Sequence, residues 1–323
     1  MIRIKDKKKN EQERIDLVYL WVDGEDPKWQ EKKRQATGKA QFGHSEIDAK
    51  GRYVSNDELK FSLRSLEKHI SWIGKIFIVT DNQIPEWLKI DHPQINIIDH
   101  SQILPKEVLP CFNSRVIEYA LYKIPGLSEH FLFANDDMLF NRDLKENFFF
   151  KEDGFPIVRM KKERFGMFYN KLRTLVGKKP GNYRSTIYKA IASIKEKFRK
   201  NYYGIPHHNI DAYKKTDYKF AVEELFNEEI KISMFNRVKS NNDVQRFAFS
   251  LYALAIGHAY PQYVNKNTSL RNQIYKDDAD ERMQKYNPAL FCMNDNQKAT
   301  DEDRKAAKDY LEKLFPEKSS FER

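Results

Sequence analysis

Four short apolar runs, rich in β-branched and aromatic residues, constrain the fold of this chain more than any other feature. They cover residues 16–22, 75–80, 95–98 and 131–134, and helical patterns cover residues 58–69 and 113–124 between them. Apolar runs of this length are typical of strands buried on both faces, and strands that alternate with helices indicate a parallel sheet. We therefore predict an α/β fold with a mostly parallel, nucleotide-binding sheet and with ligands at the carboxyl ends of its strands.

The sequence pattern changes after residue 150. A basic segment follows, and helical patterns then dominate residues 211–228, 242–258 and 301–315. We predict three parts in the 323-residue chain. Residues 1–150 form the α/β nucleotide-binding part, residues 151–203 a basic amphipathic insert, and residues 204–323 a helical part that completes a shared active site.

The positive charge is concentrated in one segment. Most of the formal net charge of +10 comes from residues 171–200, where many lysines and arginines accompany a single acid, Glu196. A local excess favours a local anionic partner over a general nucleic-acid-binding surface. Within this segment the apolar residues at positions 187, 191, 194 and 198 share one helix face. Two readings stay open: a core-packed helix with a solvated basic face, or an interfacial helix on an anionic membrane surface.

Targeting and redox signals are few. The first fourteen residues are charged throughout, unlike a signal peptide, and no apolar run is long enough to span a membrane. The two cysteines, Cys111 and Cys292, lie far apart and in no metal-ligand spacing, as is typical of a reducing compartment. We therefore expect a cytoplasmic protein, with peripheral contact at the inner face of the cell membrane as an option.

The sharpest local signal is Asn135-Asp136-Asp137, directly after the fourth apolar run. Two adjacent carboxylates at a strand end suit a divalent cation such as Mg²⁺ or Mn²⁺ bound to diphosphate oxygens. A polar turn without a metal is the alternative, because Asn and Asp favour turns. The turn after the first run, which holds Trp21, Asp23 and Gly24, either binds the base and ribose of a nucleotide or is a solvated loop.

Further candidates are weaker when taken singly. Glu118 lies in the middle of a predicted helix, where most glutamates are solvated. His207 and His208 titrate near neutrality and are either bases or surface residues. Arg237 and Lys239 either neutralise a phosphoryl group or belong to a basic surface turn.

Taken together, these stretches resemble the Stealth family of sugar-phosphate transferases. The first family region is similar to residues 15–27, and the second to residues 58–69, 76–85, 109–114 and 126–137. The third is similar to residues 206–207 and 237–250, and the fourth to residues 291–296. The resemblance extends over most of the chain outside residues 150–203. It implies a Rossmann- or GT-A-like sheet that binds a nucleotide-sugar.

The resemblance also implies roles for individual residues. It identifies Glu118 and Asp137 as active-site carboxylates and Arg64 as a contact to the donor phosphate. Asn113 and Ser114 fall in a substrate-binding stretch, and Asp295 is a further metal ligand beside Asp136 and Asp137. Two positions depart from the family pattern. Residues 204–207 lack the first histidine of a His-x-Pro-His motif, so that His207 or His208 must substitute, and Lys239 stands where the family has an arginine.

The implied reaction is transfer of a hexose-1-phosphate from a UDP-sugar or another nucleotide-sugar to a hydroxyl of a glycan acceptor, itself lipid-linked. The product is a phosphodiester of a capsular or cell-surface polysaccharide, and the nucleoside monophosphate leaves. Either Glu118 or His207 takes the acceptor proton. A metal-dependent glycosyltransferase that forms a glycosidic bond is the alternative enzyme. A basic binding protein without activity is the other alternative, which the motifs outside the basic segment disfavour.

Overall fold

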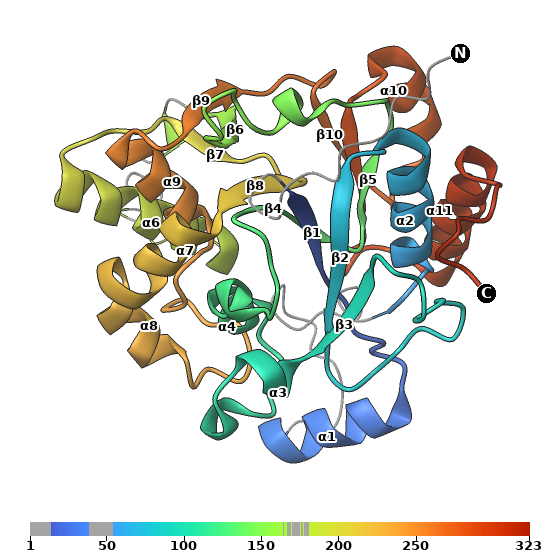
Figure 1. Ribbon diagram of the computed structural model, residues 1–323, viewed down its shortest axis with the longest axis horizontal. Coiled ribbons are helices and arrows are strands. Elements are labelled where there is room, and N and C mark those ends of the chain that lie inside the picture. Colours follow the sequence, from blue (N-terminus) through green and yellow to red (C-terminus); the bar gives the residue numbers. More distant parts are fainter. Residues whose placement is uncertain are drawn as a thin grey trace, which may run out of the picture.

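The computed structural model describes residues 14–38, 54–163 and 181–323, together with five single positions in between, 165, 166, 169, 175 and 177. A five-stranded sheet with the order β3-β2-β1-β4-β8 forms its centre (Figure 1). The strands are β1 (Ile15–Leu20), β2 (Ile73–Thr80), β3 (Ile95–Asp99), β4 (His130–Asn135) and β8 (Asp211–Lys214). The first four run parallel to one another, and β8 runs antiparallel to β4. The predicted fold class is therefore confirmed.

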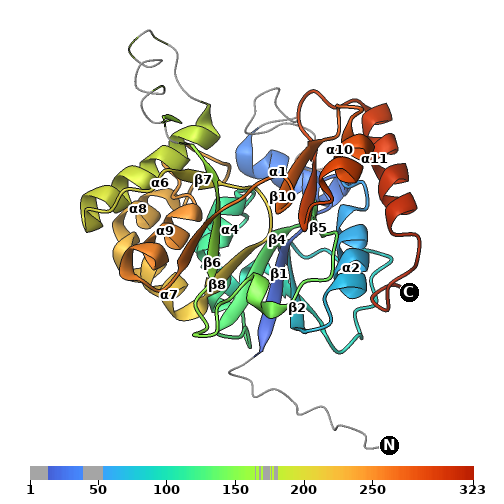
Figure 2. The ribbon, with the colours of Figure 1, turned by 90° about the horizontal axis from the view of Figure 1, so that it is seen from above.

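Both faces of the central sheet are buried. Val18 of β1 and Phe133 of β4 face one hydrophobic cluster, whereas Leu17 and Leu132 face another. This alternation follows from the two-residue period of a strand, and it explains why these strands read as unbroken apolar runs. Viewed from above, helices α6 to α9 lie on one side of the sheet and α2 and α11 on the other (Figure 2).

Helices occur both before and after the basic insert. Before the insert they are α1 (Pro27–Thr37), α2 (Glu58–His69), α3 (His100–Ile103) and α4 (Ser114–Tyr119), with short 3₁₀ turns at Lys106–Val108, Leu121–Lys123 and Glu146–Phe148. After it come α6 (Asn182–Phe198), α7 (Lys215–Phe220), the π-helical turn Ala221–Leu225, α8 (Asn227–Ser233), α9 (Phe247–Ile256), α10 (Ala279–Tyr286) and α11 (Asp301–Leu314). Within the described ranges, no helix has the length and apolar character needed to cross a bilayer.

Two small sheets flank the central one. The first has the order β10-β11-β5, from β10 (Ser269–Gln273), β11 (Leu290–Asn294) and β5 (Met138–Phe140). The second has the order β7-β6-β9, from β7 (Gly204–Pro206), β6 (Ile157–Lys162) and β9 (Tyr260–Tyr263). The first of these sheets brings residues near position 292 beside the end of β4, because β5 follows β4 after a tight turn.

The second half of the chain is less helical than predicted. The range 211–228 was predicted to be dominated by helix, and it is helical from residue 215 but begins with strand β8. Strands β6, β7, β9, β10 and β11 also lie beyond residue 150. The pattern misleads here because most of these strands, β7, β8, β9 and β10 among them, are partly or wholly exposed and therefore carry no continuous apolar run. Since β8 pairs with β4 and β11 pairs with β5, the last part of the chain shares sheets with the first.

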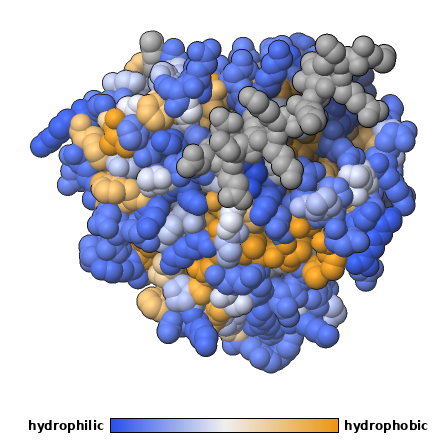
Figure 3. Space-filling model, in the orientation of Figure 1, coloured by the Kyte–Doolittle hydropathy of each residue, from blue (hydrophilic) through white to orange (hydrophobic). Residues whose placement is uncertain are grey.

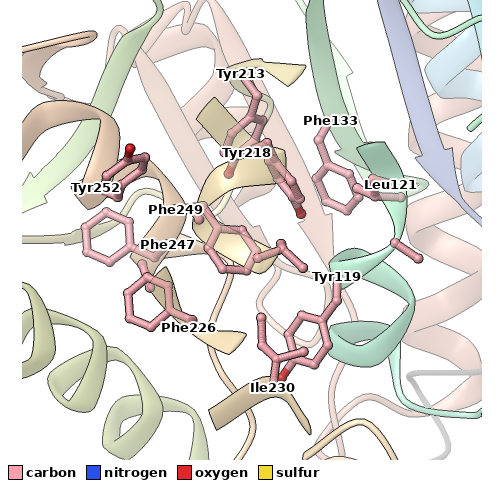
Figure 4. Close-up of a cluster of buried hydrophobic side chains, with 14 of the residues drawn as sticks. Tyr119, Leu121, Phe133, Tyr213, Tyr218, Phe226, Ile230, Phe247, Phe249 and Tyr252 are labelled. Atoms are coloured by element: carbon pink, nitrogen blue, oxygen red, sulfur yellow. The ribbon is translucent and has the colours of Figure 1, made fainter. Parts of the chain in front are cut away.

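Aromatic side chains hold the helices of the last part against the sheet. Figure 4 shows Tyr119 of α4 and Phe133 of β4 facing Tyr213, Tyr218 and Phe249. The rings of Phe131 and Tyr213 stack with centroids 5.5 Å apart, and the ring of Tyr218 packs on that of Phe249 at 4.8 Å. Large rings contribute much of the apolar area buried in a core of this kind. This cluster fixes α4 and α9 relative to β4 and β8.

The predicted amphipathic helix of the basic segment exists as α6, and its apolar face packs into the core. Ile187, Ile191 and Ile194 are 1%, 5% and 0% exposed and belong to the cluster that includes α9. Lys195 and Lys197 stay on the exposed side. The interfacial reading is corrected, because an apolar face buried against protein is not free to enter lipid. In Figure 3, the face of the molecule shown is mostly hydrophilic, with hydrophobic areas near its middle and toward its upper left.

Candidate active site

The carboxyl ends of the parallel strands meet at one edge of the central sheet. β1 and β4 are neighbours, and Leu20 at the end of β1 lies opposite Asn135 at the end of β4. The turn after β1 therefore lies beside the Asn135-Asp136-Asp137 turn. These two stretches are the strongest predictions that the sequence analysis makes for a nucleotide and a metal, and the fold brings them to the same edge.

The turn after β1 is anchored to the loop after β2. The Trp21 amide donates to the Val79 carbonyl at 3.0 Å, and Trp21 is 8% exposed. The Gln83 side chain accepts from the Asp23 amide and donates to the Asp23 carbonyl, both at 2.9 Å. Gly24 is buried next to them. The backbone of this turn is thus held in place, and substrate contacts of Trp21, Asp23 and Gly24 remain predictions.

Three carboxylates gather beyond β4. Glu58, the first residue of α2, is 7% exposed, and Asp136 and Asp137 are half-buried. Burial raises the pKa of Glu58 to about 7, and the negative charge of Asp137 adds to the shift. Burial likewise raises the pKa of Asp137 to about 6, and burial together with the charge of Glu58 holds the pKa of Asp136 well above its usual range. The three carboxyl groups therefore keep their protons to higher pH than exposed carboxyl groups do.

This carboxylate cluster fits a hard divalent cation. Asp137 Oδ1 is buried and accepts no hydrogen bond from any residue that the structure describes. Carboxylate oxygens are the hard ligands that Mg²⁺ and Mn²⁺ prefer, and Asp137 Oδ1 is available for such a contact. Glu58 is the member that the sequence analysis misses. Its position at a helix start looks like an ordinary first-turn acid, since its burial arises from contacts far away in sequence.

The β11 strand adds polar groups beside Asp137. The Met293 amide donates to the Asp137 carbonyl at 3.1 Å, which places the residues after Met293 next to the cluster. Asp295 was expected to be a metal ligand. Both Asp295 oxygens accept from the Arg304 guanidinium, at 2.7 and 3.2 Å, and metal ligation by Asp295 remains a prediction. Burial is the largest cause of the raised pKa of Asp137, and the negative charge of Asp295 adds to it.

His208 lies directly beside the end of β4. A ring nitrogen of His208, a carboxylate oxygen of Asp137 and the Cys292 sulfur lie within 4.8 Å of one another. His208 has a positive φ of 58°, a conformation uncommon for a residue other than glycine. Among the two candidate histidines, His208 is the one next to Asp137.

His207 belongs to a hydrogen-bonded network that also holds Glu118. His207 Nε2 lies 3.1 Å from Asp211 Oδ1, and Nδ1 lies 2.9 Å from the Ser269 hydroxyl. Arg246 Nη1 donates to Asp211 Oδ2 at 2.9 Å, and Arg246 Nε donates to Glu118 Oε2 at 3.2 Å. Two candidates that lie far apart in sequence are therefore joined by Asp211 and Arg246, two residues that the sequence analysis does not single out.

The same network lies close to the edge where Asp136 and Asp137 stand. Asp211 pairs in register with Phe133, two residues before the end of β4, and the Arg246 guanidinium carbon lies 3.9 Å from the Phe133 ring centroid. Both nitrogens of His207 are engaged by protein groups, and the residue is 7% exposed. Glu118 is 9% exposed, and only its Oε2 is engaged by Arg246. The second oxygen of Glu118 has no hydrogen bond from the part of the chain that the structure describes, so it is left for a substrate.

Asn113 ties the loop of the third region to α4. Its side-chain nitrogen donates to the carbonyls of Asn236 and Val238 at 3.1 and 3.3 Å and to Asp243 at 3.0 Å. Because Asn113 is fully buried, the expected substrate contact is corrected to a structural one. Ser114, the first residue of α4, is half-buried.

The loop held by Asn113 carries the two predicted cations. Arg237 and Lys239 are both half-buried. Arg237 Nη1 donates to the Pro110 carbonyl at 3.3 Å, and the Phe112 amide donates to the Arg237 carbonyl at 2.9 Å. The loop is thus fastened to residues 110–113, just before α4, and phosphoryl contacts of Arg237 and Lys239 remain predictions.

Arg64 lies on the side of α2 that meets the C-terminal segment. Its Nε and Nη2 bind the two Glu322 oxygens, each at 2.8 Å, and Nη1 donates to the Phe315 carbonyl at 2.8 Å. The Arg64 and Glu322 side chains are 6% and 4% exposed. The expected contact of Arg64 with a donor phosphate is corrected, because all three nitrogens of the guanidinium are used within the protein.

Comparison with known proteins decides the family. Models of the Stealth protein family match the chain in conserved region 1 over residues 13–41, in conserved region 2 over residues 52–158 and in conserved region 4 over residues 280–323. The chain is also 33% identical over 294 residues to the capsular polysaccharide phosphotransferase fcs1 of Haemophilus influenzae, and this match covers 87% of the chain and 78% of that protein. The chain belongs to the Stealth family.

Other relatives carry similar names. The capsular polysaccharide phosphotransferase SacB of Neisseria meningitidis serogroup A is 32% identical over 320 residues, which are 96% of this chain but 57% of that protein. An exopolysaccharide phosphotransferase of Streptomyces coelicolor is 45% identical over 141 residues, which are 43% of this chain and 24% of that protein. Among solved structures, the galactosyltransferase LgtC has a TM-score of 0.45 at 13% sequence identity, and the match covers 94% of this chain and 96% of that chain. The predicted family and class of enzyme, a Stealth phosphotransferase, are confirmed.

Proposed function

We propose that this Stealth protein transfers a hexose-1-phosphate from a nucleotide-sugar, with a UDP-sugar as the first choice, to a hydroxyl of a glycan acceptor. The reaction would form a phosphodiester of a capsular or cell-surface polysaccharide and release the nucleoside monophosphate. A lipid-linked acceptor at the cytoplasmic face of the membrane is part of the proposal. The relatives' names support phosphotransfer in polysaccharide synthesis.

One observation carries the proposal: the carboxylate cluster of Glu58, Asp136 and Asp137 at the sheet edge, beside the anchored turn after β1. In related α/β folds nucleotides bind at such an edge. A divalent cation bound by Asp136 and Asp137 would neutralise the diphosphate of the donor and the charge that develops on it. Glu58 would add a third negative charge beside the two aspartates and so increase the attraction for the cation.

The remaining groups would orient the acceptor and take its proton. The acceptor oxygen attacks the phosphorus next to the hexose, the bond from that phosphorus to the bridging oxygen breaks, and the C1–O bond of the hexose stays intact. The free oxygen of Glu118 is our choice for the group that accepts the hydroxyl proton, because His207 uses both ring nitrogens within the network. Arg246 holds Glu118 in a fixed orientation for this step, since its guanidinium donates to one carboxylate oxygen.

A donor labelled at the phosphorus next to the sugar tests the proposal. The purified protein is incubated with such UDP-sugars, Mg²⁺ and short glycan primers, and the position of the label is followed. Label in the glycan together with free UMP is the expected result. Label that stays in released UDP would instead identify a glycosyltransferase, which forms a glycosidic bond. An Asp137→Asn variant run in parallel shows whether the label moves through this site.

A further inference from the structure

Cys292 brings a sulfur atom into a site that otherwise offers oxygen and nitrogen. The Cys292 sulfur, a ring nitrogen of His208 and a carboxylate oxygen of Asp137 come from three separate segments, yet they lie within 4.8 Å of one another. Cys292 is on β11, which pairs antiparallel with β5 so that Cys292 faces Met138, the residue after Asp137. The position of the sulfur is therefore set by the sheet.

This donor set differs in chemistry from the carboxylate cluster. Hard cations such as Mg²⁺ bind oxygen, whereas Zn²⁺ binds thiolate, imidazole and carboxylate at about 2.0–2.3 Å in tetrahedral sites. Ligand atoms of one tetrahedral zinc site are roughly 3.3–3.8 Å apart at these bond lengths. Closing the 4.8 Å triad around Zn²⁺ thus needs shifts of about 1 Å, which rotation of the half-buried Asp137 and His208 side chains can supply.

We propose that Asp137, His208 and Cys292 form a second metal site, which takes Zn²⁺ or another borderline-soft divalent ion and thereby withdraws Asp137 from the hard cation. Three protein ligands leave the fourth position open to water or to a substrate oxygen. Binding replaces the proton of the Cys292 thiol by the metal and releases that proton to solvent. Asp137 cannot direct the same oxygens to both ions, so zinc acts as an inhibitor. The inhibitory part rests on the proposed function, whereas the binding part does not.

The proposed zinc site is tested by measuring metal binding alone, with no assay of transferase activity. Wild-type protein stripped of metal with a chelator is dialysed against Zn²⁺, and bound zinc is counted by elemental analysis. Co²⁺ is then used as a spectroscopic substitute, because a thiolate ligand gives it a sulfur-to-metal charge-transfer band. We expect one equivalent of bound metal and a charge-transfer band in the wild type. A Co²⁺ complex without that band overturns the proposal, and this result needs no variant.

Cys111 provides a matched control. It is the other cysteine of the chain, it is 2% exposed, and it lies just before α4 rather than in the triad. Cys111→Ser should bind Zn²⁺ like the wild type, whereas Cys292→Ser and His208→Gln should bind it at least about tenfold more weakly. Circular dichroism melting confirms that each variant is folded. Wild-type affinity in Cys292→Ser would contradict the site.

Inhibition is measured separately from binding. If the proposed transferase reaction is found, low Zn²⁺ should inhibit the wild type and Cys111→Ser in competition with Mg²⁺, and Cys292→Ser should resist. If no transferase activity is found with any donor, the proposed function fails, but the dialysis and Co²⁺ experiments still decide on the metal site. Tight zinc binding without inhibition would remove the claim that zinc withdraws Asp137.

Discussion

Arg246 lies between the carboxylates of Glu118 and Asp211 and touches both. At the residue scale, this one guanidinium decides which carboxylate oxygens of its two neighbours are already engaged within the protein. Nearby carboxylates and the ring hydroxyl of Tyr213 raise the pKa of Arg246 against the opposing effect of burial, so that it stays charged. Burial raises the pKa of Asp211, but its bond with His207 and the charge of Arg246 more than offset this and hold it below its usual range. His207 therefore faces a permanent anion, and Glu118 keeps one oxygen for a substrate.

Glu118→Gln should lower kcat by at least about 10²-fold, the effect typical of losing a general acid or base. The glutamine amide oxygen can still accept from Arg246, so the melting temperature should change little. Steady-state kinetics on the donor and primer of the labelling assay measure the effect. His207→Asn is the comparison, and we expect it to lower stability more than Glu118→Gln does, because both His207 nitrogens are bonded inside the protein. Wild-type turnover by Glu118→Gln would move the role of base to His208.

Arg64 gives a second test at this scale. Arg64→Ala leaves the Glu322 carboxylate buried without its partner, and breaking such a pair from one side costs about 3–5 kcal/mol. We therefore expect a large loss in the free energy of unfolding, measured by urea denaturation, and an unchanged KM for the donor in the protein that remains folded. Glu322→Gln should also destabilise. A raised KM with unchanged stability would instead restore the phosphate contact that the family resemblance implies.

At the element scale, α6 shows why the sequence left two interpretations of an amphipathic helix open. Its apolar stripe was predicted correctly, and the stripe packs on the side of α9 rather than on lipid. The partner of an amphipathic helix cannot be read from the helix itself, because core and membrane interface both accept an apolar face. Basic side chains of α6 also contact protein groups distant in sequence: Lys197 forms a 3.6 Å ion pair with Glu229 on α8, and Lys189 donates to the Asn241 carbonyl at 2.8 Å.

Ile194→Ala in α6 should cost about 2–5 kcal/mol in the free energy of unfolding, since it leaves a cavity at a side chain that is 0% exposed. Lys195→Ala, at the exposed position next to it, should stay within about 0.5 kcal/mol of the wild type. Chemical denaturation measures both. Equal stability of the two variants, together with weaker sedimentation of Ile194→Ala on anionic vesicles, would return α6 to the membrane.

At the scale of the whole molecule, the sequence predicts the parallel sheet but not the edges and flanks that complete it. β1 to β4 are buried on both faces and so carry continuous apolar runs. β8 is a four-residue edge strand that runs straight into α7, and its two buried residues do not stand out from the helical pattern that follows. The candidate site likewise has residues that the sequence predicts and residues that it does not. Asp137 stands at the end of a predictable strand, whereas Glu58 and Arg246 acquire their roles only through contacts distant in sequence.

The carboxylate cluster makes the free energy of unfolding of the whole molecule depend on pH and on bound cations. Because the folded-state pKa values of Glu58, Asp136 and Asp137 are raised, these groups favour the folded state at low pH. Without metal, that contribution is present below about pH 4, the range of unfolded carboxylates, and is lost as the pH rises through about 6 to 7. A cation competes with protons for the same oxygens, so it should bind more tightly once the cluster is ionised.

We therefore expect Mg²⁺ or Mn²⁺ to stabilise the chelator-treated protein more at pH 8 than at pH 5.5. A cation at a hundredfold excess over its dissociation constant contributes about 2.7 kcal/mol, and the same concentration should contribute less at pH 5.5, where the raised pKa values keep protons on the cluster. Thermal melts with and without cation at each pH give the difference directly, and other titrating groups cancel. Asp137→Asn should abolish the metal-dependent shift, whereas Glu228→Gln, at a side chain 81% exposed on α8, should retain it. A shift of equal size at both pH values, or one that survives in Asp137→Asn, would place the cation away from this cluster.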